Sequence, residues 1–103
     1  SPMNALIAAL VSFIAVSGSI ASEGDVEYGA YLAAECASCH RSGAAADEPI
    51  PSIEGWDEAT FVTVMQSFRR KERDNVAMQT IAAALDDEQM AALAAYFAAR
   101  DTD

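Results

Sequence analysis

The sequence has little positive charge. Its 103 residues include 6 basic and 16 acidic ones, which gives a formal net charge of −10 at pH 7. Nucleic acids and anionic membrane surfaces both attract proteins through Lys and Arg side chains. We therefore expect no nucleic-acid partner, and no contact with a membrane except through the apolar N-terminal residues described below.

Cysteine and histidine are scarce as well. The two cysteines and the single histidine all lie in the stretch Cys36-Ala37-Ser38-Cys39-His40. A structural zinc site needs four ligands, usually Cys or His, so this chain would have to complete one with a carboxylate. A thioredoxin-like redox pair needs a strand–helix–strand context, and the sequence shows no such alternation. A disulfide beside an unrelated His, or a metal site, stays open as an alternative.

The pattern C-x-x-C-H is typical of covalent attachment of a c-type haem. Cys36 and Cys39 are spaced to lie on one side of a helical turn, so both thiols can form thioethers with one edge of a porphyrin. His40 would then lie under the ring, where a neutral imidazole nitrogen is a suitable axial ligand for iron. We predict one covalently bound haem c, with Cys36 and Cys39 as attachment residues and His40 as an iron ligand.

Long apolar runs are absent. The stretch from Asn4 to Ala21 carries no charge, but its most apolar part covers only residues 5–16. A membrane span needs about 20 apolar residues, whereas a secretory signal has a shorter apolar part followed by small residues. The stretch lacks the positive residues that precede most signals. We expect residues 1–21 to be an export segment or an N-terminal membrane anchor, and residues 22–103 to be one domain in the periplasm.

Strand patterns are also absent, and the composition favours helices. Hydrophobic residues make up 52% of the chain, and Ala-rich segments with Leu, Met, Tyr and Phe are good helix formers. Residues 22–103 are few for a self-sufficient core, and an apolar macrocycle would add buried surface. We predict an all-α domain of a few helices wrapped around the haem.

Periodicity and capping residues predict four helices. Asp25 suits the N-cap of the first helix, and Asp86 with Gln89 forms a capping pair for the last. Their expected bounds are about 26–36, 57–72, 76–85 and 87–100, with a loop at 41–53.

Gly29, within the first helix, indicates the close approach of a second helix, because a glycine there is otherwise unfavourable. We expect the last helix to be this partner, with Tyr96 and Phe97 lying against Gly29 and Tyr31. This crossing would hold the haem pocket together.

A second axial ligand is expected from a methionine. Met78 lies far enough along the chain from His40 to reach the opposite face of the haem. Met3 lies in the N-terminal segment, Met65 in the apolar stripe of a helix, and Met90 along the last helix, so these are poorer candidates. We predict His40 and Met78 as the two iron ligands; the alternative is that Met78 is an ordinary core residue.

Three further residues are candidates for the haem environment. A carbonyl near Pro51 would accept the proton on the second ring nitrogen of His40, or Pro51 would only stiffen the loop. Trp56 would lie against a haem edge or cap the core. Arg73 belongs to a basic cluster at residues 69–73, which would lie beside the haem propionates or form an ordinary solvated helix end.

Taken together, these residues resemble those of a small class I cytochrome c. The resemblance covers residues 25–100, through Gly29-x-Tyr31-Leu32, the C-x-x-C-H motif, Pro51, Met78 and Tyr96-Phe97. It implies a class I cytochrome c fold, His40 and Met78 as axial ligands, and the Pro51 carbonyl as the partner of His40.

A narrower resemblance rests on the second half of the chain. Arg73-x-x-x-x-Met78-x-x-Ile81, followed by residues 85–88 and 94–97, is similar to the single-haem cytochrome subunits of flavocytochrome c sulfide dehydrogenases. In that family a flavoprotein partner oxidises sulfide and passes electrons to the haem. The resemblance implies a redox protein partner, and such a flavoprotein subunit is the candidate.

The sequence therefore predicts a one-electron carrier whose iron has both axial positions filled by side chains. Such a chain would be a subunit of an oxidoreductase and would not itself be the catalyst. The alternative is a gas-sensing or peroxidase-like haem protein in which the distal ligand is displaceable.

Overall fold

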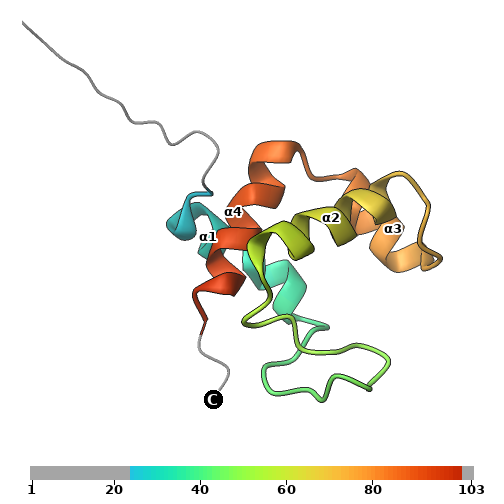
Figure 1. Ribbon diagram of the computed structural model, residues 1–103, viewed down its shortest axis with the longest axis horizontal. Helices are drawn as coiled ribbons and strands as arrows, with labels where there is room; N and C mark the ends of the chain where they lie inside the picture. The colour runs from blue at the N-terminus through green and yellow to red at the C-terminus, as the bar shows by residue number, and fades with distance from the viewer. Residues whose placement is uncertain (1–23, 101–103) are drawn as a thin grey trace, which may run out of the picture.

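The computed structural model describes residues 24–100, and this part of the chain is all-helical (Figure 1). Its helices are α1 (Val26–Ala37), α2 (Glu58–Arg69), α3 (Val76–Ala83) and α4 (Asp87–Ala98). The prediction of an all-α domain is confirmed. The expected export segment or anchor at residues 1–21 lies outside the described residues. Within residues 24–100, no helix has the length and apolar character needed to cross a membrane.

Each of the four helices begins at a polar side chain that caps it. Asp25 accepts hydrogen bonds from the first backbone N–H groups of α1. Asp86 and Gln89 form a reciprocal capping box at the start of α4. At the starts of α2 and α3, the side chains of Asp57 and Asn75 accept hydrogen bonds from backbone N–H groups of the first turn. Since a helix leaves its first N–H groups without intrahelical partners, these side chains fix where each helix begins.

Helix α2 ends earlier than expected, at Arg69 rather than near residue 72. Lys71 has a φ of 62°. The Lys71 N–H donates to the Phe68 carbonyl at 2.9 Å, and the Glu72 N–H donates to the Ser67 carbonyl at 2.8 Å. These two bonds form a Schellman motif, with lysine in the left-handed position that glycine usually takes. The expected end was wrong because no glycine marked this turn.

The first and last helices cross closely at Gly29. Helix α4 lies between α1 and α2 in Figure 1. A Cβ atom added to Gly29 would lie 2.1 Å from the carbonyl oxygen of Ala92 and 2.7 Å from the Cβ of Tyr96. Only glycine permits so short a distance between the two helices. The predicted close approach of the last helix to Gly29 is therefore confirmed.

Tyr31 takes no part in this crossing, contrary to expectation. Its side chain is 78% exposed, whereas α1 buries Gly29 and Ala33. Positions four apart share one face of a helix, and a position two residues away points to the other side. Tyr31 therefore faces away from α4.

The core lies where α4 meets α2 and α1. Met90 and Leu93 are fully buried, and Phe61 is 2% exposed. Phe61 stacks on Phe97 with ring centroids 5.8 Å apart. Met65 is buried in the same cluster, so its predicted core role is confirmed. This packing fixes α2 and α4 relative to each other.

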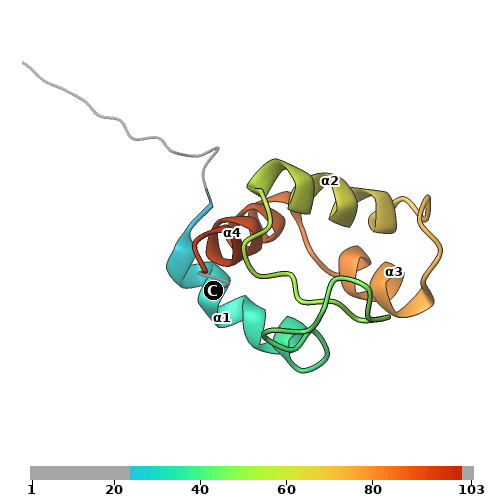
Figure 2. The same ribbon diagram turned by 60° about the horizontal axis from the view of Figure 1, so that its bottom comes forward.

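Helices α1 and α3 each pack against one other helix, α1 against α4 and α3 against α2. Among the four described helices, α1 and α3 do not pack on each other. The two lie toward opposite ends of the domain in both views (Figure 1, Figure 2). The loop at residues 38–57 leaves the end of α1, extends on the side of α3 and returns to α2 (Figure 2). The end of α1 and the start of α3 therefore reach the same core without packing on each other, since Cys36 and Met78 both pack against it.

Candidate functional site

The C-x-x-C-H stretch continues the last turn of α1. The backbone N–H groups of Cys39 and His40 both donate to the carbonyl oxygen of Cys36, at 3.1 and 2.9 Å. These bonds keep the two cysteines and the histidine within one compact turn. Both cysteines are free thiols, with Cys36 half-buried and Cys39 exposed. The expected attachment residues therefore lie together at one end of α1.

Cys36 is the more enclosed of the two thiols. Burial raises the pKa of the Cys36 thiol above its ordinary value, and the neighbouring carboxylate of Glu35 raises this pKa further. Cys36 is thus neutral at neutral pH, which suits its partly apolar surroundings.

The structure gives no support to the two alternatives for this motif. Cys36 and Cys39 are not joined by a disulfide. In the part of the chain that the structure describes, no three His, Cys, Asp or Glu side chains gather closely enough to hold a metal ion.

His40 is oriented by the loop that follows it. Its Nδ1 lies 2.7 Å from the carbonyl oxygen of Pro51, and both groups are partly buried. A carbonyl oxygen can only accept, so Nδ1 carries the proton and Nε2 keeps its lone pair. The predicted contact between His40 and Pro51 is present. It leaves Nε2 of His40 as the nitrogen able to bind a metal ion.

Met78 lies in the first turn of α3. Its side chain is partly buried and packs against the edge of the core. Met65 and Met90, in contrast, are 5% and 0% exposed within the core. The sulfur of Met90 also lies 3.0 Å from a guanidinium nitrogen of Arg69. Met78 is thus the methionine in the described part whose thioether is not enclosed by the core.

Trp56 lies at the end of the loop, immediately before the α2 cap. It is partly buried against the core, and its ring meets Phe61 edge-on at a centroid distance of 6.5 Å. This contact accounts for a core-capping role; a role at a haem edge stays a prediction.

The basic cluster at residues 69–73 does not act as one surface. Arg69 forms an ion pair with Asp87 at 2.9 Å, and Arg70 forms one with Glu72 at 3.0 Å. Arg73 is exposed, and its guanidinium lies 5.3 Å from the centroid of the Phe68 ring. Arg69 and Arg70 thus have partners within the protein, and a role of Arg73 beside haem propionates stays a prediction.

Sequence reasoning missed Glu54, which anchors the loop that carries Pro51. Its carboxylate accepts from Ser42 at 2.9 Å and pairs with Arg100 at 3.3 Å, and its side chain is only 13% exposed. The next residue, Gly55, donates its N–H to the Phe97 carbonyl at 2.8 Å. The available signal in the sequence was an acidic residue, Glu54, directly after the apolar Ile53 in a loop. These contacts tie the loop to the end of α4, and thereby fix the Pro51 carbonyl beside His40.

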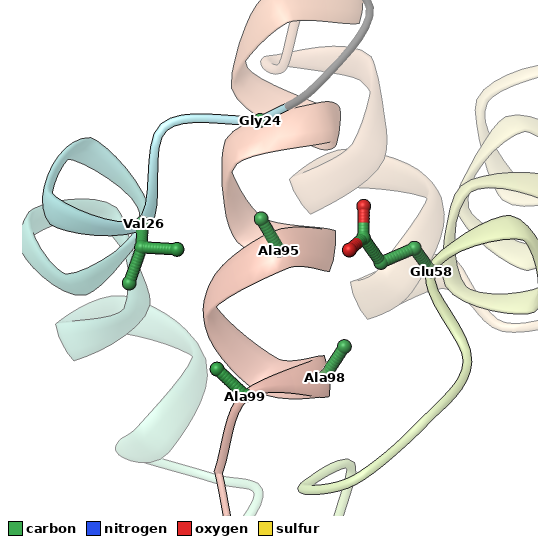
Figure 3. A pocket seen from close by; sticks show the side chains of 6 residues that line it. All are labelled: Gly24, Val26, Glu58, Ala95, Ala98 and Ala99. Atoms are coloured by element: carbon green, nitrogen blue, oxygen red, sulfur yellow. The ribbon is translucent and has the colours of Figure 1, made fainter.

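A separate groove lies at the opposite end of α1. It is lined by Gly24, Val26, Glu58, Ala95, Ala98 and Ala99 (Figure 3). The Glu58 carboxylate is the only ionisable group among these lining residues, and the groove shares no residue with the C-x-x-C-H turn. It has no donor set suited to a metal ion or a cofactor.

The donor set at the end of α1 fits a c-type haem. Two free thiols lie on one turn, an imidazole is held in the tautomer that leaves Nε2 available, and a partly buried thioether lies on a helix that does not pack against α1. Two cysteine thiols at this spacing attach a c-type haem covalently, and imidazole nitrogen and thioether sulfur are groups that hold its iron.

Comparisons with known proteins agree with this assignment. The model of the family described as "Cytochrome C oxidase, cbb3-type, subunit III" matches residues 23–97. Cytochrome c4 of Pseudomonas aeruginosa is 28% identical to this chain over 99 residues, which are 95% of the chain and 49% of that protein. The chain thus spans about half the length of this curated relative. With its all-helical fold, which is consistent with class I cytochrome c, the chain belongs to this family of c-type cytochrome domains, whose function is haem-based electron transfer.

Proposed function

We propose that this chain carries one haem c through Cys36 and Cys39, with His40 and Met78 as axial ligands, and that it transfers single electrons between protein partners. When bound, the haem supplies a one-electron Fe(III)/Fe(II) couple. The observation that best supports the proposal is the C-x-x-C-H turn: Cys36, Cys39 and His40 lie in one compact turn, and the Pro51 carbonyl leaves Nε2 of His40 available to iron.

His40 would bind iron through Nε2. The Pro51 carbonyl, 2.7 Å from Nδ1, fixes the tautomer and the ring orientation, and it increases the basicity of the binding nitrogen. The loop anchored by Glu54 and Arg100 keeps this carbonyl in place.

Met78 would bind iron from the other side through its thioether. A thioether opposite an imidazole favours the reduced iron and raises the reduction potential. With both axial positions held by His40 and Met78, no position is left for a substrate, which suits an electron carrier.

The partner is proposed from charge and from the narrower sequence resemblance. The net charge of −10 favours a redox protein with a basic docking face, and association with it would weaken as salt increases. A sulfide-oxidising flavoprotein is our candidate donor, acting in the periplasm. In that arrangement the partner is the catalyst and this chain is the electron acceptor.

One observation favours a second candidate function. Met78 lies in the first turn of α3, where Val76 is 76% exposed and Ala77 is exposed, so its thioether is the ligand that would leave iron most readily. A displaceable Met78 would make the domain a gas sensor or a peroxidase-like protein. Rapid, tight binding of carbon monoxide to the reduced haem-loaded protein supports this function, and slow or absent binding supports the electron carrier.

A matched pair of substitutions tests the ligand assignment. Met78→Leu and Met65→Leu make the same change at the proposed ligand and in the core. We expect the sulfur-to-iron charge-transfer band of the ferric protein to disappear in Met78→Leu and to remain in Met65→Leu. Loss of the band in Met65→Leu alone would contradict the assignment. Intact mass spectrometry of the denatured protein, with one haem added, tests covalent attachment.

A further inference from the structure

The first turn of α3 is only partly secured by apolar packing. Helix α3 has eight residues, and Ala82, near its far end, is the only one that is buried. In the first turn Val76 is 76% exposed, Ala77 is exposed and Met78 is only partly buried. Met78 is therefore the one side chain of this turn that packs against the core, and apolar contacts hold the turn only in part.

Polar contacts also fix this turn. The side-chain oxygen of Asn75 accepts from the backbone N–H of Met78 itself, at 2.9 Å. The side-chain amide of Gln79, the next residue, donates to the carbonyl oxygen of Arg73 at 2.8 Å. One bond thus ends on the Met78 backbone, and the other joins its neighbour to the preceding loop.

The preceding loop is in turn attached to α2. The guanidinium of Arg73 lies over the Phe68 ring, and Phe68 packs against the core. The left-handed turn at Lys71 starts the loop in a defined direction. A continuous set of contacts therefore runs from the core through Arg73 and Gln79 to the backbone at Met78.

We propose that Asn75 and Gln79 are positioning residues for the Met78 ligand: they stabilise the conformation in which the thioether faces the iron. This inference rests on the proposed function. Neither side chain needs to touch the haem; both act through the backbone on either side of Met78. Without them α3 would still form, but the turn bearing the ligand would open more often.

Exogenous imidazole measures this effect, because it binds ferric iron only when the thioether has left. In the haem-loaded ferric protein we expect Asn75→Ala to bind imidazole about fivefold more tightly than wild type, the effect of one lost cap. Gln79→Met, which keeps the length of the side chain and removes its donor, should act in the same direction and weaken the charge-transfer band.

Two variants separate positioning from general stability. Asn75→Asp keeps the capping oxygen and should bind imidazole as wild type does. Asp86→Ala removes an equivalent cap, 2.8 Å from Gln89 N, from a helix without a ligand. It should lower the denaturation midpoint as much as Asn75→Ala but leave imidazole affinity unchanged.

Any one of four results would overturn the proposal. If Asn75→Ala lowers the denaturation midpoint without changing imidazole affinity, Asn75 is only a helix cap. If Asp86→Ala raises imidazole affinity equally, the effect is global. If wild type lacks the charge-transfer band, the Met78 assignment fails and this inference fails with it. If wild type has the band and both α3 variants match it in imidazole affinity, only the inference fails.

Discussion

The two ends of this domain are built differently. At the α1–α4 crossing the backbones of two twelve-residue helices approach so closely that a single methyl group at Gly29 would clash. At α3 an eight-residue helix packs against one neighbour and is fixed at its start by side-chain hydrogen bonds. The proposed attachment residues lie at the far end of α1, and the proposed second ligand lies in the first turn of α3. In this arrangement the proposed His40 ligand would be held by its loop, while the proposed Met78 ligand would respond to small changes in the local stability of α3.

The largest effect is expected from enlarging Gly29. In Gly29→Val the new side chain would meet the Ala92 carbonyl, so α1 must move away from α4. Overpacking of this kind should cost about 3 kcal/mol or more in the free energy of unfolding, measured by guanidinium denaturation of the haem-loaded protein. Gly43→Ala is the control, because a Cβ there meets no atom within 4 Å. Its φ of 79° should cost only about 1–2 kcal/mol. Equal losses in the two variants would show that the crossing is not close-packed.

A second comparison contrasts an α4 side chain with an α3 side chain. Met90→Ala removes a fully buried side chain and should destabilise the domain by about 2–5 kcal/mol. Val76→Ala truncates a side chain that is 76% exposed, so its effect should stay within about 0.5 kcal/mol. Urea denaturation of both variants checks the difference. A large loss in Val76→Ala would mean that Val76 gives the first turn of α3 apolar support after all.

The smallest effect is expected at the Arg70–Glu72 pair. The hydrogen bond from Arg70 lowers the pKa of Glu72. A carboxylate with a lowered folded-state pKa stabilises the protein above its unfolded pKa, and this contribution is lost as the pH falls through the folded value. Both side chains are exposed to solvent, which screens the pair. Glu72→Gln should therefore have the same denaturation midpoint as wild type at each pH between 7 and 3. A midpoint that falls with pH in wild type but not in Glu72→Gln would contradict this.

Local signals in the sequence predicted the helix starts and the C-x-x-C-H turn. Capping by Asp25 and by Asp86 with Gln89 depends on residues within one turn of each other, so the pattern is visible in the chain. The contact between His40 and Pro51 was one of two roles expected for Pro51, because the prolines lie in the loop that follows the histidine. Gly29 indicated a helix crossing because no local reason for a glycine was present.

Features that depend on distant or unusual contacts were not predictable. The left-handed conformation of Lys71 ended α2 early, and lysine gives no signal of such a turn. Tyr31 was placed against α4 as a large apolar ring, but its helical position relative to Gly29 points it outward. The bond between Glu54 and Arg100 joins residues far apart in the sequence, so neither residue alone revealed it.

The pairing of α1 with α4 also affects the order in which the domain forms. The N-terminal helix packs against the last one, so α1 has no stable partner until the C-terminal helix is available. Bringing these two helices together also costs loop-closure entropy, because many residues separate them. Cys36 and Cys39 at the end of α1 thus remain accessible in the unfinished chain. Covalent attachment at these thiols can precede the folding step that encloses Cys36, so the attached group can take part in folding rather than enter a finished pocket.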